Sequence, residues 1–358
     1  MVEALLLVGV AVAAFVGYNI GGATTGPAFG PAVGADVLSK AGAAGLMSVF
    51  FFVGAGTLGQ RVVTTLGEDL VTGANVFTLE TSIIVLFFIG GALFVGNFAG
   101  VPASTSMTAV GSIAGLGIAT NTLDWAVMGE IAIWWLVAPI IGFWVSGVVG
   151  RYFYSAIDRW VAIESTDGAL FEFDRSGLIP RPVLGPNTTR RELTGGIVVI
   201  SIGCLMAFSS GTSNIANAIA PLVALDGVEM TPMILLGSAA VAVGAFTIAR
   251  RTLDTLGNDI TDLPLTAAIV VAVVSSGIVI SLSAVGIPAS FVIIATMSIV
   301  GLGWGRATRT VTVRQGIKGE KEPTVSVGAL TADEMPEIGE GDASAIPSAS
   351  DLFNPGTS

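Results

Sequence analysis

Long apolar runs separated by short polar stretches set the pattern of the chain. Each run is about 20 residues long and nearly free of charge, which is the length that a helix needs to cross a hydrocarbon core. The first run lacks a basic start and a small-residue cleavage site, so we expect it to stay in the protein as a helix. The runs predict an all-α, polytopic membrane protein with nine spans, at residues 3–20, 42–60, 80–99, 104–121, 125–149, 194–211, 231–250, 264–284 and 287–305.

Composition supports this class and limits the chemistry. Of the 358 residues, 53% are hydrophobic and 11% are charged, compared with about 25% charged residues in soluble domains. The chain has no His and a single Cys, Cys204, which removes the usual metal ligands, a disulfide within the chain and the commonest proton-transfer group. We therefore expect neither an enzyme nor a metal site. The net charge of −11 with only three Lys is typical of halophilic, haloarchaeal-type proteins, because high salt screens their self-repulsion.

The polar segments divide the chain into four parts. Residues 1–150 form a first transmembrane repeat, 151–192 a loop, 193–305 a second transmembrane repeat and 306–358 an acidic tail that we expect to be disordered. Six Arg lie in the stretch 151–191, which the positive-inside rule places in the cytoplasm. Counting crossings from this loop predicts that the N-terminus lies outside the cell and that the tail is cytoplasmic.

An internal repeat relates the two transmembrane parts. Three pairs of motifs recur in the same order: "NIGGA" (19–23) with "NIANA" (214–218), "QRVVTTLGEDL" (60–70) with "RRTLDTLGNDI" (250–260), and "VPAS" (101–104) with "IPAS" (287–290). An odd number of crossings between the copies predicts an inverted-topology repeat, which is a common plan of secondary transporters. The first repeat has a fifth span, at 125–149, and the second repeat lacks a counterpart of it. We expect a chain shortened from its full form, and the alternative is a branch that has dispensed with this helix.

Polar residues beside Gly or Pro interrupt the apolar runs at 17–31, 101–108, 211–222 and 286–291. Non-helical backbone at membrane depth is tolerated where it is buried in protein or lines a cavity, so we expect broken or re-entrant helices here. A half-helix that begins at such a break directs unpaired N–H groups and the positive end of its dipole at an anion. In "PASTS", Pro102 would begin a helix whose first turn carries three hydroxyls, those of Ser104, Thr105 and Ser106. The alternative is a capped helix whose hydroxyls are all satisfied locally.

One acidic residue lies inside a predicted span. Glu130 is a candidate proton or cation relay, since intramembrane acids are commonly functional. The alternative is that it caps a helix or is paired within the bundle. Glu80 lies at the start of its span, and the simpler interpretation is that its side chain lies at the membrane–water interface.

These motifs, taken in order, resemble the inorganic phosphate transporter (PiT) family of secondary permeases, which includes sulfate-transporting members. The resemblance rests on "GTSNIANAIAPL", "VPASTSMTAVGSIAGLGIA", "GIPASFVIIATMSIVGLGWGRA" and "ARRTLDTLGNDITDL". It implies an inverted-repeat bundle that is often a homodimer, with an oxyanion at the midplane and coupling to Na⁺ or H⁺. The implied substrate-binding residues are Asn19, Gly21, Gly22, Thr24, Thr25, Ser104, Thr105, Ser106, Ser213, Asn214, Asn217 and Ser290.

The family carries a duplicated signature that resembles G-x-N-D-x-A-N-A-x-G-P, and this chain lacks the signature Asp in both copies. Aligning the two copies by "NI" puts Asn19 and Asn214 at that position, whereas aligning the first copy by its Gly-x-Asn puts Ile20 there. Neutral Asn keeps a carbonyl oxygen but loses the charge that a Na⁺ ion prefers, and the cavity becomes more favourable for an anion. Candidates for contacting the coupling ion are therefore Asn19, Asn214 and Glu130, and no other cofactor is expected.

The function predicted from these residues is secondary transport of inorganic phosphate across the cell membrane by alternating access. Sulfate or another oxyanion is the first alternative, because the missing Asp residues remove acceptors for a phosphate O–H group. A non-transporting sensor or partner subunit built on a permease scaffold is the second. The expected partners are the oxyanion, the lipid bilayer and a second copy of the chain, without nucleic acid.

Overall fold

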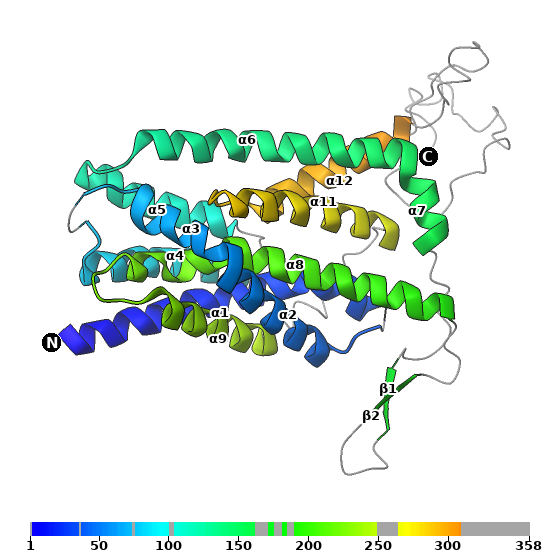
Figure 1. The fold of residues 1–358 in the computed structure, drawn as a ribbon, viewed down its shortest axis with the longest axis horizontal. Coiled ribbons are helices and arrows are strands. Elements are labelled where there is room, and N and C mark those ends of the chain that lie inside the picture. Colours follow the sequence, from blue (N-terminus) through cyan, green and yellow to red (C-terminus); the bar gives the residue numbers. More distant parts are fainter. Residues whose placement is uncertain are drawn as a thin grey trace, which may run out of the picture.

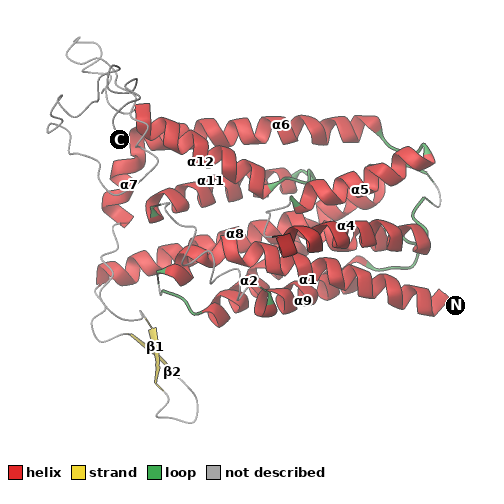
Figure 2. Ribbon diagram, turned by 180° about the vertical axis from the view of Figure 1, so that it is seen from behind, coloured by secondary structure: helices red, strands yellow, loops and turns green. Residues whose placement is uncertain are grey.

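The computed structural model describes residues 2–35, 37–73, 76–99, 104–161, 171–174, 181–184, 190–248 and 264–308. Its helices form one elongated bundle (Figures 1 and 2). They are α1 (Val2–Gly34), α2 (Lys40–Gly54), α3 (Gln60–Thr64), α4 (Leu79–Ala99), α5 (Thr105–Thr120), α6 (Trp125–Val148), α7 (Tyr154–Val161), α8 (Arg190–Val223), α9 (Met230–Thr247), α11 (Leu265–Ala284) and α12 (Phe291–Ala307). An antiparallel hairpin of β1 (Phe171–Asp174) and β2 (Arg181–Leu184) lies in the loop between the repeats.

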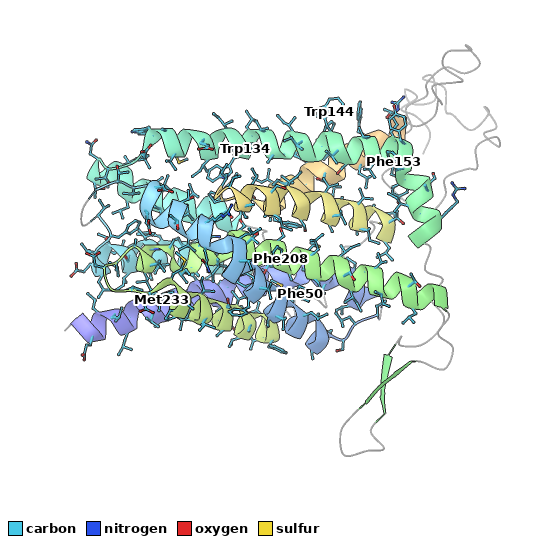
Figure 3. All side chains as sticks on the ribbon, in the orientation of Figure 1. Phe50, Trp134, Trp144, Phe153, Phe208 and Met233 are labelled. Carbon is cyan, nitrogen blue, oxygen red and sulfur yellow. The ribbon has the colours of Figure 1, made fainter. Side chains whose placement is uncertain are left out.

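Single π-helical turns connect successive helices without an intervening loop. Turns η1 (Ala55–Gly59) and η2 (Thr65–Asp69) lie on either side of α3, and η3 (Val149–Phe153) joins α6 to α7. Seven of the described helices are long and apolar enough to cross a membrane. Large apolar side chains project outward as in a lipid-facing surface, and Trp144 on α6 is 55% exposed (Figure 3). The all-α polytopic class is confirmed.

Four of the nine predicted spans form two hairpins that each enter and leave at the same end of the bundle. For α4 and α5, the backbone N–H of Thr72 donates to the carbonyl of Thr122 at 2.9 Å, at the end where α1 begins. For α11 and α12, the opposite end is marked by α7: the hydroxyl of Thr266, at the start of α11, donates to the carboxylate of Asp158 at 2.7 Å, and the guanidinium of Arg306, at the end of α12, lies over the ring of Tyr154. Helices α5 and α12 have 16 and 17 residues, or about 24–26 Å, which is shorter than the ~30 Å hydrocarbon core.

The breaks expected at 17–31 and 211–222 are wrong. Helices α1 and α8 run through these stretches without interruption over 33 and 34 residues, with Pro27, Pro31 and Pro221 inside them. The Thr25 hydroxyl adds a hydrogen bond to the carbonyl of Gly21 at 2.7 Å within the continuous helix. Gly and Pro are tolerated within transmembrane helices because neighbouring groups can satisfy the backbone that they free.

Glycines let the helices of one half approach those of the other. A Cβ atom on Gly21 of α1 would overlap the carbonyl oxygen of Val241 in α9, and one on Gly244 would overlap that of Tyr18. Helices α8 and α2 repeat this arrangement: Gly211 lies against the carbonyl of Phe51, and Gly54 lies against that of Phe208. The two contacts are related by a constant offset of 190 positions, which pairs Tyr18 with Phe208, Gly21 with Gly211, Phe51 with Val241 and Gly54 with Gly244.

This offset corrects the register of the repeat. It is the offset that relates 60–70 to 250–260, and it also pairs Pro31 with Pro221. The alignment of "NIGGA" with "NIANA" uses 195 positions instead, and the packing does not support it. With the corrected register, Thr24 rather than Asn19 is the counterpart of Asn214.

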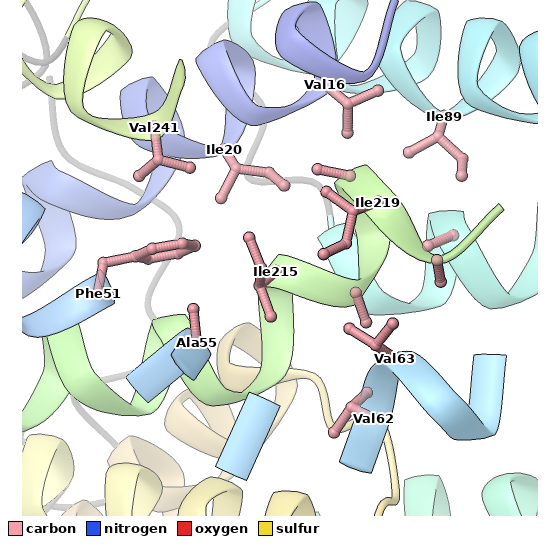
Figure 4. Packing of buried hydrophobic residues seen from close by; sticks show 14 of the residues in the cluster. Val16, Ile20, Phe51, Ala55, Val62, Val63, Ile89, Ile215, Ile219 and Val241 are labelled. Carbon is pink, nitrogen blue, oxygen red and sulfur yellow. The ribbon is translucent and has the colours of Figure 1, made fainter. Parts of the chain in front are cut away.

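The main hydrophobic core surrounds the C-terminal part of α8. Ile215 and Ile219 lie between Ile20 of α1, Phe51 of α2 and Val63 of α3 (Figure 4). All five side chains are buried. The polar residues of α8 lie in the same stretch of helix, so this core fixes where their side chains point.

Candidate substrate site

A cluster of hydroxyl and amide groups lies where the tips of the two hairpins meet. Ser104 and Ser290 are the N-caps of α5 and α12, and their hydroxyls accept hydrogen bonds from the N–H groups of Met107 and Ile293. The Ser104 hydroxyl donates to the Ser290 hydroxyl at 2.9 Å. Two helix N-termini therefore converge on one buried place, and both dipoles favour a negative charge there.

Asn214 of α8 is the acceptor at the centre of this cluster. Its Oδ1 atom accepts hydrogen bonds from the Thr105 hydroxyl at 2.7 Å and from Nδ2 of Asn217 at 3.3 Å. The Ser106 hydroxyl lies 3.5 Å from the same oxygen, and its single proton has a shorter bond to the carbonyl of Ala289. The Nδ2 group of Asn214 donates to the Ser210 hydroxyl at 2.9 Å, which fixes the orientation of the amide. Two donors are thus directed at one oxygen, as they would be at an oxygen of a bound oxyanion.

Further hydrogen bonds connect α5, α8 and α6 to residues 288–290, the segment just before α12, which we call the α12 tip. The hydroxyls of Ser106 and Ser213 both donate to the carbonyl of Ala289, at 2.9 and 3.0 Å. The indole N–H of Trp135 in α6 donates to the carbonyl of Pro288 at 2.9 Å. The α12 tip is therefore held by α5, α8 and α6 together. Asn217 is fully buried, and its Oδ1 atom has no hydrogen-bond partner.

The cluster is neutral, since its members are Ser, Thr and Asn together with one backbone carbonyl. Within the described ranges, no group of three or more His, Cys, Asp or Glu is placed to hold a metal ion. The cluster offers many donors and one unused acceptor, a combination that suits an oxyanion better than a bare cation.

Several predicted residues do not join this cluster. Asn19 is buried in α1, and its backbone and side-chain oxygens accept hydrogen bonds from Nδ2 of Asn97 at 3.1 and 3.2 Å. Gly22 faces the side chain of Ile248, so it serves helix packing, as Gly21 does. The hydroxyls of Thr24 and Thr25 donate to carbonyls of their own helix. The cluster thus draws on α5, α8 and the α12 tip, and α1 contributes no hydrogen bond to it.

Glu130 lines a separate cavity of about 330 Å³ at the end of the bundle where α1 begins. Three other acids, Glu68, Asp69 and Asp124, share this cavity. The backbone of Gly286 forms part of its wall, two residues before Pro288. The cavity therefore reaches the loop that leads to the α12 tip. The predicted interfacial role of Glu80 stays a prediction, although the residue does lie in the first turn of α4; Pro102 and the stretch 250–260 lie outside the described residues.

Sequence reasoning missed two groups of the cluster. Ser210 precedes Asn214 by four residues, and this helical spacing could have revealed it. The carbonyl of Ala289 carries no side-chain signal at all. Outside the cluster, Asn97, the partner of Asn19, belongs to no repeated motif. Their roles depend on how the hairpins fold back, which the sequence pattern did not disclose.

Comparison with known proteins decides the family. The model of the phosphate transporter family matches residues 20–320. The chain belongs to the phosphate transporter family. Among relatives of this family member, the sulfate permease CysP of Bacillus subtilis is 30% identical over 296 residues, covering 82% of this chain and 75% of the permease. The chloroplastic inorganic phosphate transporter 2-1 of Arabidopsis thaliana is 25% identical over 408 residues, covering 89% of this chain and 69% of the relative.

A solved structure of a sodium-dependent phosphate transporter has the same fold as this member of the phosphate transporter family. The TM-score is 0.66 at 18% sequence identity, and the match covers 88% of this chain and 93% of the other. The resemblance to the PiT family is therefore confirmed.

Proposed function

We propose that this protein is a secondary permease for inorganic phosphate that works by alternating access. The observation that carries the proposal is the buried cluster between two hairpins that enter the bundle from opposite ends. A site in this position can be opened to either side when one hairpin moves relative to the other. The family and the phosphate transporters similar to this chain support the same substrate.

The hydrogen bonds of the cluster suggest how the substrate would be bound. An incoming oxyanion would take the place of the Asn214 Oδ1 atom as the acceptor for Thr105, and the Ser106 hydroxyl would turn from the carbonyl of Ala289 toward the anion. The N-termini of α5 and α12 would add their dipoles, and Asn217 Oδ1 could accept the O–H group of a protonated phosphate. Binding would thus exchange internal hydrogen bonds for stronger, charge-assisted ones.

Cation coupling belongs to the proposal as well. Four carboxylates in the cavity beside Glu130 would raise the local concentration of cations next to the α12 tip. The sodium-dependent phosphate transporter that shares this fold favours Na⁺ as the coupling ion. The Arg-rich loop 151–191 favours an orientation with the N-terminus outside and both the loop and the tail in the cytoplasm.

Uptake of radiolabelled phosphate into proteoliposomes tests the function. We expect accumulation that a Na⁺ or a proton gradient increases, and that Thr105→Val lowers at subsaturating phosphate. Absence of uptake under both gradients, from protein shown to be folded, would leave the sensor or partner-subunit function as the better account.

Sulfate is the second candidate substrate. The specific observation in its favour is the neutral cluster, which has many donors and lacks a carboxylate that could accept the O–H group of phosphate. The 30% identity to a sulfate permease points the same way. Unlabelled sulfate added to the phosphate uptake assay separates the two: strong competition by sulfate favours a sulfate permease, and weak competition favours phosphate.

A further inference from the structure

Arg306, in the last turn of α12, is a buried positive charge that the substrate cluster does not use. The residue is 7% exposed, and its Nε atom is buried without a hydrogen-bond partner. Among the residues that the structure describes, no carboxylate forms an ion pair with it. A guanidinium keeps its charge when it is buried, and a buried charge is costly unless an opposite charge or hydrogen bonds replace its hydration. Arg306 is therefore a candidate site for an anion.

The contacts around Arg306 offset only part of this cost. Its guanidinium carbon lies 4.3 Å from the centre of the Tyr154 ring, which is a cation–π contact. The C-terminal end of α12 adds the negative end of a helix dipole. The acid of α7 on this side, Asp158, accepts a hydrogen bond from the Thr266 hydroxyl at 2.7 Å instead. Neither the ring nor the dipole provides an oxygen atom that could accept from the buried Nε–H group.

Arg306 lies at the level where the headgroups of a bilayer are expected. Helix α7 begins at Tyr154 and turns away from α6 across this end of the bundle (Figure 1). Next to it in the chain, Tyr152 and Phe153 are 55% and 54% exposed, and Trp304 of α12 is 47% exposed. Exposed aromatic side chains gather at the membrane–water interface. An anion that reaches Arg306 from this side would come from the headgroup layer.

Arg151 adds a second positive charge beside the end of α12. It follows Gly150, which packs closely on this helix: a Cβ atom on Gly150 would lie 3.3 Å from the backbone nitrogen of Arg306. The Arg151 guanidinium lies 5.6 Å from the centre of the exposed Tyr152 ring. Guanidinium groups suit phosphate because they can donate two parallel N–H bonds to its oxygens. Basic pockets between membrane helices at this level bind phosphate headgroups.

We propose that Arg306 binds the headgroup phosphate of an anionic lipid, with Arg151 as a second, outer contact. The exposed rings beside the two guanidinium groups would lie against the glycerol and acyl chains, which a free anion lacks. Helix α12 carries Ser290 at its N-cap and Arg306 in its last turn. The bound lipid would thus hold one end of α12 against α7, while the other end presents Ser290 to the transported anion.

Lipid binding to the detergent-purified full-length protein tests this site. In native mass spectrometry with phosphatidylglycerol and zwitterionic phosphatidylethanolamine, we expect the unmodified protein to retain phosphatidylglycerol preferentially. Arg306→Gln should weaken its binding about tenfold or more, because a hydrogen bond to a charged group is lost. Arg159→Gln, at an exposed residue of α7, removes the same charge and should bind as the unmodified protein does. Equal retention of both lipids by the unmodified protein overturns the proposal, as does equal binding of phosphatidylglycerol by the two variants.

Inorganic phosphate distinguishes a lipid headgroup from a free anion. We expect phosphatidylglycerol to raise the melting temperature of the unmodified protein more than that of Arg306→Gln. Inorganic phosphate should raise both melting temperatures equally, because the cluster around Asn214 is unchanged. If Arg306→Gln loses the effect of inorganic phosphate and keeps that of phosphatidylglycerol, then Arg306 binds the free anion and the proposal is overturned. The preference between the two lipids does not depend on which anion is transported, so it tests the lipid site separately from the proposed function.

Discussion

At the residue scale, Asn214 is the group on which the polar cluster depends. Its Oδ1 atom accepts hydrogen bonds from Thr105 and Asn217, and Ser210 holds the amide in place. The family signature has an Asp at this position, and a carboxylate there would repel an oxyanion unless a cation neutralised it. We therefore expect the neutral amide to make anion binding less dependent on a bound cation.

Removing the hydroxyl nearest to Asn214 should weaken anion binding. Thr105→Val keeps the shape of the side chain but loses a donor to the anion, which is worth about 1.5–3 kcal/mol, or a factor of about 10–150 in affinity. Radioligand binding of phosphate and of sulfate to detergent-purified protein measures this change. Thr120→Val, at the far end of the same helix, is the control and should bind as the unmodified protein does. Equal affinities for the two variants would exclude Thr105 from the site.

Restoring the charge should make binding depend on the cation. Asn214→Asp places a negative charge among the donors, so we expect weak phosphate binding without Na⁺ and recovery when Na⁺ is added. Asn121→Asp, at the C-cap of α5 and away from the cluster, controls for net charge. If Na⁺ improves binding to Asn214→Asp no more than to the control, then position 214 does not contact the coupling ion.

Part of the site could be predicted from single residues, and part could not. The three hydroxyls of "PASTS" and the amides of "NIANA" were found because small polar residues are conspicuous in an apolar run. Asn19 was assigned to the site from shared letters, whereas the packing of Gly21 and Gly211 shows a different register. A match of residue types in the sequence does not reveal which face of a helix packs against another backbone.

At the scale of elements, the apolar pattern predicted where helices lie but not which of them cross the membrane. Helices α5 and α12 had enough apolar residues to be taken as spans, although their length from N-cap to C-cap falls short. Conversely, the Gly and Pro residues in α1 and α8 suggested breaks that do not occur. In a packed membrane bundle, Gly also allows the backbones of two helices to approach closely, so its presence does not by itself indicate a break.

The docking of α12 on α6 should be sensitive to one methyl group. Gly301→Ala puts a Cβ atom into the carbonyl of Phe143, and overpacking of this kind costs about 1–3 kcal/mol. Gly115→Ala, at the equivalent position of α5, is the matched control because its new methyl group meets nothing in the chain. Thermal unfolding in detergent should show a lower melting temperature for Gly301→Ala alone. Equal melting temperatures for the two variants would contradict the α6–α12 contact.

At the scale of the whole molecule, two hairpins entering from opposite ends hold the cluster between them. The loop at Asn121 and the end of α12 at Thr308 lie at opposite ends of the bundle, and the Arg-rich loop predicts which end faces the cytoplasm. In a Cys204→Ser background, a membrane-impermeant maleimide added to intact cells should label Asn121→Cys. It should label Thr308→Cys only after permeabilisation, and the reverse pattern would invert the proposed orientation.

Locating a bound anion by diffraction tests the proposed site most directly. Crystals grown with selenate or arsenate, analogues of sulfate and phosphate, would show the heavy atom as an anomalous peak. We predict a peak between the N-termini of α5 and α12, within hydrogen-bonding distance of Thr105 and Ser106, with the Asn214 amide displaced from them. A protein that transports the anion but shows its peak elsewhere, with the bond from Thr105 to Asn214 intact, would contradict the proposed site.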